Sequence, residues 1–348
     1  YCKEPILAVT GTNGKTTTTT LLGEIVKASG ITTHVVGNIG VPFTDKVDEM
    51  ESSHMAVVEI SSFQLQTVEE FHPWISLMLN LTPDHLDRHK TMENYLATKA
   101  RIFENQCEGD FLILNGEDSL VKELKPDNGS KVFFFSRLQT LEEGAWLENG
   151  HIMVNIGKGA LPICSVDQVG ILGSHNLENA LAAALAAALA GVEPTIIAKV
   201  LKEFPGVEHR IEKVDTIDGV VYYNDSKGTN PESSIKAIDA MKGSVVLIAG
   251  GYDKKASYGD FIDAFGSKVK ELVLLGETAD AIAAAAKEKG FNNIHMTKTI
   301  EEAVEKACEL SYPGWNVLLS PACASWDMFK DFEERGRVFK EAVKALRR

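Results

Sequence analysis

The sequence ILAVTGTNGKTTTTT, residues 6–20, decides the fold of the first half of the chain. It begins with a short apolar segment, residues 6–9, which predicts a buried strand. A glycine-bearing turn follows, and Lys15 then leads a run of threonines into a helix predicted at residues 18–28. A strand, a glycine turn with a lysine and a helix, in that order, predict a loop that binds phosphate groups and indicate ATP chemistry.

The residue types of this loop fit what a triphosphate needs. Gly11 and Gly14 let backbone N–H groups approach the phosphates, Lys15 supplies a cation, and the Thr16 hydroxyl can ligate Mg²⁺. The general phosphate-loop pattern has a glycine where this chain has Val9, so only the shorter form GTNGKT matches. The alternative is a glycine-rich turn with a surface lysine, but the strand before the loop and the helix after it favour phosphate binding.

The composition limits the class of protein. The chain has 348 residues, enough for two domains, and a formal net charge of −14, so we expect no large basic face and no nucleic-acid partner. The five cysteines show no C-x-x-C spacing, which indicates neither a disulfide framework nor a zinc cluster and is typical of reduced cytosolic thiols. They are Cys2, Cys107, Cys164, Cys308 and Cys323.

The sequence does not resemble a membrane protein. Its longest weakly polar stretch, residues 180–192, is alanine-rich, and no charged-then-apolar leader begins the chain. We therefore expect a cytoplasmic monomer with no membrane partner. Because the first residue is Tyr1 and the loop strand follows almost at once, we also expect that an upstream segment has been removed.

Apolar runs bounded by polar turns alternate with helical segments, which predicts an α/β fold with a mostly parallel sheet covered by helices. In the first half the predicted strands are residues 55–60, 75–81, 111–114 and 131–136. Short strand-like segments within residues 146–169 predict a small β-hairpin that extends from the sheet. Residues 177–190 predict a helix whose alanines allow close packing.

A domain boundary is predicted where Pro205 and Gly206 interrupt a helix, giving domains at residues 1–206 and 207–348. The second half predicts a Rossmann-like α/β unit that lacks G-x-G-x-x-G and therefore a dinucleotide site. Its predicted strands are residues 220–224, 244–249, 271–275 and 315–320, with helices that include residues 279–289 and 300–311.

Two strand ends carry residues that suit a metal ion. Glu59 ends an apolar strand, and open α/β sheets bind ligands at the carboxyl ends of their strands. The next strand runs into TPDHLDRH, residues 82–89, which brings His85 to another strand end. Each feature alone has an ordinary alternative, a solvated carboxylate or a structural histidine. Together, beside a phosphate loop, they favour a metal site.

Seven segments along the chain resemble motifs of the Mur ligases, and two of them, NDSKGTN and SPACASWD, resemble the members that add D-glutamate. The segments are GTNGKT (11–16), VEISSFQL (58–65), NLTPDHLDRH (80–89), GSHNLENALAA (173–183), EHR (208–210), NDSKGTNP (224–231) and SPACASWDMF (320–329). The resemblance implies an ATP-dependent amide ligase that joins D-glutamate to UDP-N-acetylmuramoyl-L-alanine through an acyl phosphate, in peptidoglycan biosynthesis. The motifs match the central P-loop ATPase domain and the C-terminal Rossmann-like domain of the family, so we expect that its N-terminal UDP-binding domain is lacking.

The resemblance also implies roles toward ATP and metal. Lys15 would contact the β- and γ-phosphates, Thr16 and Glu59 would hold one Mg²⁺, and His85 and a carbamylated Lys99 would hold a second; Mn²⁺ could replace Mg²⁺. The further implied ATP contacts are Gly11, Thr12, Asn13, Gly14, Thr17, Asn176, Asn179, Arg210 and Asp225. The alternative for Lys99 is a solvated helix lysine, and for the two asparagines it is capping of a helix start.

The organic substrates would meet a further set of residues. Lys227 and Asp225 would lie over the phosphates or the acyl phosphate. The implied D-glutamate contacts are Thr229, Ser325, Phe332 and either Lys254 or Lys255, because an extra residue in GGYDKKAS leaves that choice open. Asn38, Ser61 and His209 complete the implied substrate contacts.

Two other interpretations stay open at this point. Folylpolyglutamate synthases share the GTNGKT-type loop and the ligation chemistry, although the DSKGTN and SPACAS segments count against them. The chain could also be a fragment that binds Mg-ATP but has no turnover. Assays of ATP binding and of turnover would separate these alternatives.

Overall fold

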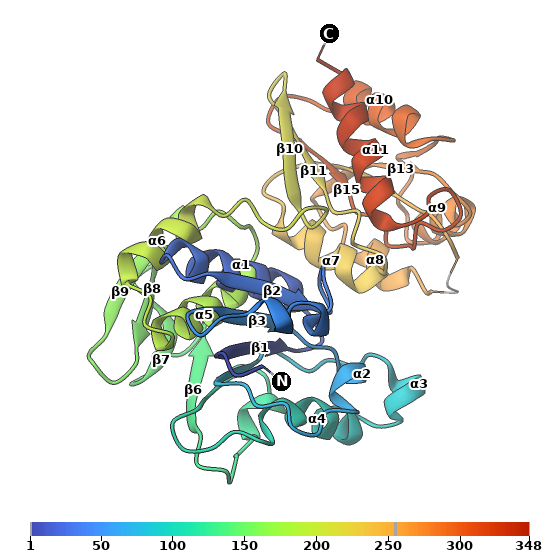
Figure 1. Cartoon of the computed structure of the whole chain (residues 1–348). Coiled ribbons are helices and arrows are strands. Elements are labelled where there is room, and N and C mark those ends of the chain that lie inside the picture. Colours follow the sequence, from blue (N-terminus) through green and yellow to red (C-terminus); the bar gives the residue numbers. More distant parts are fainter. Residues whose placement is uncertain (1, 254–255, 348) are drawn as a thin grey trace. The chain divides into compact units, whose positions relative to one another are not determined.

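The computed structural model describes residues 2–253 and 256–347, with the side chain of Asp87 also outside the description. The chain divides into two compact units, Tyr1–Phe204 and Pro205–Arg348, and each is built on one large sheet (Figure 1). The structure therefore divides the chain close to the boundary placed after residue 206. Within the described residues, no helix has the length and apolar composition needed to cross a membrane.

The first unit contains a nine-stranded sheet in the order β2-β3-β1-β4-β5-β6-β7-β8-β9. Its strands run parallel from β2 to β7, and β7, β8 and β9 then pair antiparallel. The predicted parallel sheet and the β-hairpin are both confirmed. The strands are β1 (Ile6–Thr10), β2 (Thr33–Gly37), β3 (Met55–Glu59), β4 (Ile75–Met78), β5 (Phe111–Asn115), β6 (Lys131–Ser136), β7 (Gly144–Glu148), β8 (His151–Asn155) and β9 (Leu161–Ser165).

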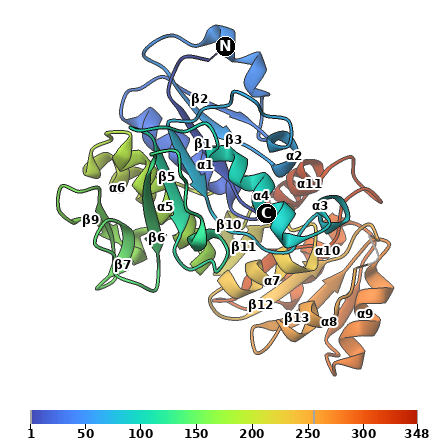
Figure 2. The same ribbon diagram turned by 90° about the horizontal axis from the view of Figure 1, so that it is seen from below.

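Helices cover both faces of this sheet, because its central strands are apolar on both sides. On one side α1 (Lys15–Ala28) packs against α5 (Ser174–Leu189) and α6 (Pro194–Glu203). On the other lie the short helices α2 (Ser62–Leu65) and α3 (Leu86–His89) and the helix α4 (Met92–Ala100) (Figures 1 and 2). The alanines of α5 between Ala180 and Ala187 are fully buried, as close helix packing requires.

The second unit contains a six-stranded sheet in the order β10-β11-β15-β12-β13-β14, parallel except for β10. The strands are β10 (Glu212–Ile217), β11 (Val220–Asn224), β12 (Val245–Ala249), β13 (Val269–Leu274), β14 (Ile294–Met296) and β15 (Asn316–Leu319). The helices are α7 (Pro231–Ala240), α8 (Gly259–Asp263), α9 (Ala279–Glu288), α10 (Ile300–Leu310) and α11 (Phe332–Ala345).

Alternating residues of these strands pack on opposite faces. Leu247 and Ala249 of β12 join a core with α7, α8 and α9, whereas Val246 and Ile248 join one with α10 and α11. This is the two-residue period of a strand buried on both sides. The predicted Rossmann-like α/β unit is confirmed.

Several elements differ from the predictions. Helix α1 begins at Lys15 rather than at residue 18, because Gly14 takes a left-handed conformation (φ 85°) and directs the chain into the helix at once. Strands β2, β10 and β14 were not predicted, since all three are only partly buried and lack a continuous apolar run.

Candidate functional site

The phosphate loop lies at the carboxyl edge of the first sheet, between β1 and α1. The register places Val9 of β1 beside Glu59 of β3, and Gly37 of β2 beside Glu59 on its other side. The residues that follow β1, β2, β3 and β4 therefore meet at one edge, which is where open α/β sheets bind ligands.

The loop leaves backbone donors at the start of α1. Gly14 precedes the helix without a side-chain cap. The Thr18 N–H donates to the Gly14 carbonyl oxygen (2.9 Å). The N–H groups of the first turn have no partner within the helix, and with the positive end of the helix dipole they suit an anion. A side chain at Gly14 would overlap Asn179, since its Cβ would lie 2.3 Å from Asn179 Oδ1.

The segment after β4 fixes the shape of this loop. The Thr12 N–H donates to the carbonyl oxygen of Asn80 (3.0 Å), and the Asn13 N–H donates to Asn80 Oδ1 (2.8 Å). Asn80 Nδ2 donates in return to the carbonyl oxygen of Asn13 (3.0 Å), and the Thr82 N–H donates to Thr12 Oγ1 (3.1 Å). The loop is therefore organised before any ligand binds.

Two lysines converge on the loop. Lys15 Nζ donates to the carbonyl oxygens of Gly11 and Thr12 (both 2.9 Å), and Lys99 Nζ donates to that of Gly11 (2.8 Å). Lys99 is buried, with its ammonium 4.8 Å from the centre of the Tyr95 ring. Burial, and after it the charge of Lys15, lower the pKa of Lys99 to about 7. A neutral amine is thus accessible at Lys99 near neutral pH.

Glu59 offers a carboxylate oxygen to a ligand. Asn38 Nδ2 donates to Oε1 (3.0 Å), but Oε2 is buried and accepts no hydrogen bond from the described residues. The nearby Thr16 is buried at the start of α1. An unpaired carboxylate oxygen and a hydroxyl beside a phosphate loop are oxygen ligands of the kind that Mg²⁺ prefers, so these residues fit the ion.

The predicted second metal ligand lies in an exposed turn. His85 has a left-handed backbone (φ 50°), its ring contacts Phe63 edge-on, and its Nε2 lies 3.4 Å from the Asp84 carboxylate. The charge of Asp84 opposes part of the lowering of the pKa of Lys99. The role of His85 stays a prediction.

The two predicted ATP-contacting asparagines are buried. Asn179 Oδ1 accepts a hydrogen bond from Thr18 Oγ1 (3.2 Å), and its Nδ2 donates to Asn176 Oδ1 (3.1 Å). Asn176 Nδ2 donates in turn to the carbonyl oxygen of Leu172 (2.6 Å). These bonds join α5 to α1 directly behind the loop. In this structure the two amides support the phosphate loop, and their contact with a nucleotide stays a prediction.

The second unit gathers its own predicted residues after β11. Asp225 is buried: Oδ2 accepts from Ser320 Oγ (2.7 Å) and Oδ1 from the Ile211 N–H (3.2 Å). Burial raises the pKa of Asp225 to about 7, although the Ser320 hydrogen bond and the charge of the half-buried Arg210 oppose the rise. Gly228 must lack a side chain, since its Cβ would lie 2.5 Å from Asp225 Oδ2.

Three further predicted residues lie together beside Asp225. Lys227 Nζ is 5.3 Å from the centre of the Phe332 ring, and the His209 ring contacts Phe332 edge-on. The Lys227 N–H donates to the carbonyl oxygen of His209 (3.0 Å). Gly336 makes room for His209, because a Cβ there would lie 2.1 Å from its Nδ1. The structure thus presents a cation and an aromatic ring at one place.

Arg335 is the residue of this site that sequence reasoning missed. It is buried, yet it pairs with no carboxylate at hydrogen-bond distance among the described residues. Instead it donates to Ser226 Oγ (3.0 Å) and to the carbonyl oxygens of Ser226 (2.8 Å), Cys323 (3.1 Å) and Ala324 (3.2 Å). Burial lowers its pKa to about 10, so it stays charged. Arg335 ties the loop after β11 to the loop after β15.

The remaining predicted residues vary in exposure. Ser325 is buried in the loop after β15, and Thr229 is half-buried after β11. Ser61 forms a capping box with Gln64 at the start of α2. Lys254 and Lys255 lie outside the described residues, so their contribution to a D-glutamate site stays a prediction.

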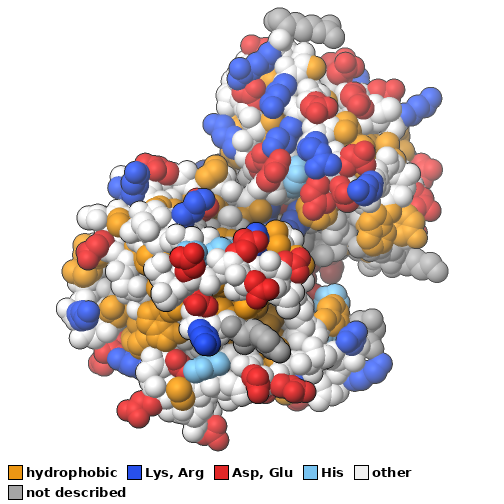
Figure 3. Space-filling view, in the orientation of Figure 1, with side chains coloured by type: hydrophobic (Ala, Val, Ile, Leu, Met, Phe, Trp, Pro, Cys, Tyr) orange, Lys and Arg blue, Asp and Glu red, His pale blue; other side chains and the backbone are white. Residues whose placement is uncertain are grey.

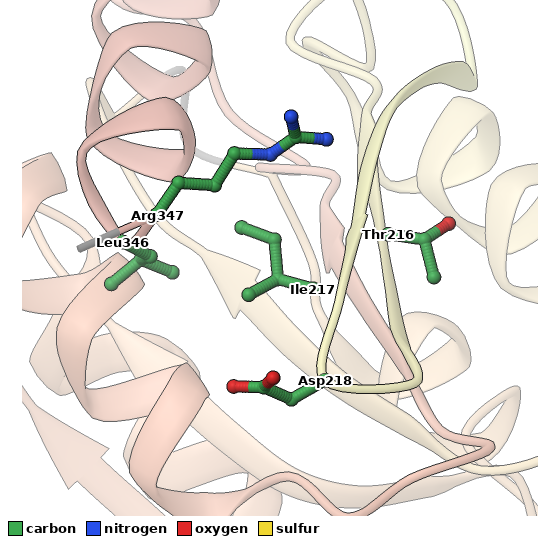
Figure 4. Close-up of a pocket in the computed structure, with 5 residues that line it drawn as sticks. All are labelled: Thr216, Ile217, Asp218, Leu346 and Arg347. Atoms are coloured by element: carbon green, nitrogen blue, oxygen red, sulfur yellow. The ribbon is translucent and has the colours of Figure 1, made fainter.

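Other surface features do not belong to this site. A cavity of about 370 Å³, lined by Thr216, Ile217, Asp218, Leu346 and Arg347, lies at the turn between β10 and β11 (Figure 4). That turn is at the opposite end of β11 from Asp225. On the face shown in Figure 3, basic and acidic side chains are interspersed. Among the described residues of this face, no extended basic surface of the kind that binds nucleic acid is seen.

Comparisons with known proteins cover both units. Residues 9–187 match the Mur ligase middle domain, and residues 209–323 match the Mur ligase glutamate ligase domain. The chain is 53% identical over 350 residues to the UDP-N-acetylmuramoylalanine--D-glutamate ligase of Thermoanaerobacter sp. (strain X514), covering 100% of this chain and 77% of that protein. It is 51% identical to the enzyme of the same name from Pelotomaculum thermopropionicum, covering 100% and 76%.

Solved structures share the fold. UDP-N-acetylmuramate-alanine ligase MurC from Thermotoga maritima has a TM-score of 0.70 at 20% identity, over 99% of this chain and 76% of that one. MurF ligase from the same organism, solved in complex with ADP, has a TM-score of 0.70 at 16% identity, over 99% and 81%.

Proposed function

This chain belongs to the Mur ligase family, and we propose that it joins D-glutamate to UDP-N-acetylmuramoyl-L-alanine at the expense of ATP. The identity of 53% to a ligase of that name supports the choice of substrates. The structural observation that carries the proposal is the preformed phosphate loop, with Lys15, Lys99 and the unpaired oxygen of Glu59 around it. The same relatives count against a folylpolyglutamate synthase.

In the first step, a substrate carboxylate oxygen attacks the γ-phosphorus of ATP and ADP leaves. Catalysis of such a transfer rests on positioning and on neutralising charge. The first-turn N–H groups of α1 and Lys15 bind the phosphates, with Gly11, Thr12, Asn13, Gly14 and Thr17 shaping the loop. Mg²⁺ supplies further neutralisation when bound; Thr16 and Glu59 would hold one ion, and His85 and Lys99 a second.

Lys99 serves this step as a carbamate in the proposal. Its uncharged amine adds to CO₂ and releases one proton, which leaves an anion at a position where the protonated side chain would be a buried cation. The change removes the repulsion between Lys99 and Lys15 and provides an oxygen ligand for a metal ion.

In the second step, the amine of D-glutamate attacks the carbonyl carbon of the acyl phosphate, and phosphate leaves. Negative charge develops on the carbonyl oxygen, so a cation must lie nearby. Lys227, which lies over the Phe332 ring, supplies this cation. Asp225, whose pKa is raised to about 7 by burial, can accept the proton that the amine releases. Thr229, Ser325 and one of Lys254 and Lys255 would bind the two carboxylates of D-glutamate.

Asn176 and Asn179 support the phosphate loop through their hydrogen bonds. In addition, these two residues and Arg210 would contact the adenosine of ATP. Asn38, Ser61 and His209 complete the substrate contacts. The proposal places the enzyme in the cytoplasm as a monomer, supplied with ATP and Mg²⁺ and committed to peptidoglycan synthesis and cell-wall formation.

Amino-acid-dependent release of ADP tests this function. The chain would be assayed with Mg-ATP and UDP-N-acetylmuramoyl-L-alanine, and with D-glutamate, L-glutamate, L-lysine or meso-diaminopimelate in turn. A second version would carry the preceding segment of a relative, because the relatives are longer than this chain. D-Glutamate alone should stimulate ADP release. ATP binding without release in both versions would favour a nucleotide-binding protein without turnover.

A further inference from the structure

Three side chains with different metal-binding atoms meet at the amino edge of the first sheet. His72 lies just before β4, and Cys107 and Asp110 lie just before β5. Strands β4 and β5 are parallel neighbours, with Ile75 beside Phe111, so the segments that precede them converge. The phosphate loop follows the carboxyl end of β1, at the opposite edge of the same sheet. The cluster is therefore separate from the candidate ligase site.

The ligand atoms are already close. One atom from each of His72, Cys107 and Asp110 lies within 4.8 Å of the others. His72 Nε2 is 2.6 Å from Asp110 Oδ2, and the Cys107 N–H donates to the same oxygen (2.7 Å). Tetrahedral zinc sites hold nitrogen at about 2.0 Å and sulfur at about 2.3 Å from the ion. His72 and Cys107 are exposed, so their side chains have room to rotate when an ion binds.

The backbone around the cluster is fixed by the sheet. The Asp110 N–H donates to the carbonyl oxygen of Cys107 (3.1 Å), and the Asp110 carbonyl oxygen accepts from the Lys131 N–H (2.9 Å). The Phe111 N–H donates to the carbonyl oxygen of Trp74 (2.9 Å), which joins the two converging segments. The Asp110 side chain is only 10% exposed. The carboxylate is therefore held in place, and a ligand need not order this region.

An open space adjoins the cluster. A cavity of about 400 Å³ is lined by His72 and Asp110 together with Trp74, Met55 and the segment of residues 3–6. A metal ion bound by three protein atoms here keeps room for a fourth ligand, such as water. Three protein ligands with an open position are the arrangement of reactive zinc sites, whereas structural sites are closed by four.

We propose that His72, Cys107 and Asp110 form a Zn²⁺ site with one open coordination position. Nitrogen, thiolate and carboxylate ligands suit Zn²⁺, whereas Mg²⁺ prefers oxygen alone, so this site and the site at Glu59 select different ions. A thiolate and a carboxylate balance the two charges of the ion.

The spacing of the cysteines along the sequence could not reveal this site. His72 is far from Cys107 in the chain, and the two come together only because β4 pairs with β5. The Asp110 carboxylate raises the pKa of the Cys107 thiol.

A second group of metal-binding residues in the described chain, Glu208, His209 and Glu212, carries no such inference. Lys340 Nζ already bonds both glutamates, at 2.9 and 2.6 Å. A metal ion there would have to displace this ammonium group. Among the described residues, no lysine or arginine forms an ion pair with His72, Cys107 or Asp110.

Titration with Co²⁺ tests the proposal, because Co²⁺ reports a thiolate ligand by charge-transfer absorption in the near ultraviolet. The chain should bind one equivalent with this band, and excess Zn²⁺ should abolish it while excess Mg²⁺ should not. C107S should lose the band, and H72A should weaken binding at least about 10-fold. The matched control, C308S, should keep both the band and the affinity.

Both altered side chains are exposed, so circular dichroism should show unchanged folding. ADP release should also be unchanged in C107S and H72A, since neither residue belongs to the ligase site. No thiolate band in the unaltered chain, a band that survives C107S, or a band lost equally in C308S would overturn the proposal.

Discussion

The side-chain amines of Lys15 and Lys99 both donate hydrogen bonds to the carbonyl oxygen of Gly11, at 2.9 and 2.8 Å. One carbonyl oxygen can accept from two donors, but two ammonium groups so close repel each other. Lys15 lies at the start of α1, whereas Lys99 is buried on α4. The charge is therefore lost more readily at Lys99, and several consequences can be measured.

Stability should depend on pH through Lys99. Its pKa is lowered from 10.5 in the unfolded chain to about 7 in the folded one. Between these values the unfolded state binds more protons, so the free energy of unfolding rises with pH across this window, by up to about 1.4 kcal/mol per pH unit from this group. Urea unfolding of K99M from pH 7.5 to 9.5 should lack this slope. The exposed control K27M should keep it; an equal slope in K99M would contradict the lowered pKa.

Activity should depend on an anion at position 99. K99A should lose at least about 10²-fold in kcat, because a buried metal ligand is missing. Added short carboxylic acids should restore part of the loss by occupying the space of the carbamate. K15A should not respond to the same acids, since it lacks a cation instead. Full activity of K99A without any acid would remove the carbamate from the account.

The Glu59 carboxylate should be needed for Mg²⁺ binding and not for the stability of the fold. Its Oε2 is buried and accepts no hydrogen bond from the described residues. We therefore expect the free energy of unfolding of E59Q, measured without metal, to equal that of the parent chain or to exceed it by about 1 kcal/mol. The same variant should lose the Mg²⁺ dependence of ATP binding, measured by calorimetry at several Mg²⁺ concentrations. An E59Q chain that unfolds at a lower temperature would show that the carboxylate is a structural element.

Arg335 should act on D-glutamate through the two loops that it joins. Arg335→Met leaves four buried acceptors without their donor and should cost about 3–5 kcal/mol of stability. Arg335→Lys keeps the charge but not the geometry of the guanidinium group. For that milder variant we expect a higher KM for D-glutamate and an unchanged KM for ATP. An increase in both constants would indicate a general loosening of the unit.

The sequence allows part of this site to be predicted because some of its geometry is local. A strand, two glycines and a lysine suffice to define the phosphate loop, and the end of an apolar strand suffices to place Glu59 at the same edge. Both follow from neighbours along the chain. The parallel sheets follow equally from the alternation of strands and helices, and the comparisons with known folds agree.

Contacts between distant segments could not be predicted in this way. Asn179 lies 161 residues from Thr18, and only the packing of α5 on α1 unites their side chains. Arg335 finds its acceptors on loops after two different strands, and nothing near it in the sequence indicates them. The lowered pKa of Lys99 depends on its burial, which the pattern YLATK does not reveal.

The most direct test of the central claim follows the oxygen atoms of the substrate. UDP-N-acetylmuramoyl-L-alanine labelled with ¹⁸O in its carboxylate would be incubated with Mg-ATP and D-glutamate, and the phosphate released would be analysed by mass spectrometry. An acyl phosphate requires one ¹⁸O in each phosphate, formed only with D-glutamate, because the carboxylate oxygen stays with the departing phosphate. Unlabelled phosphate together with amide product would contradict an acyl phosphate.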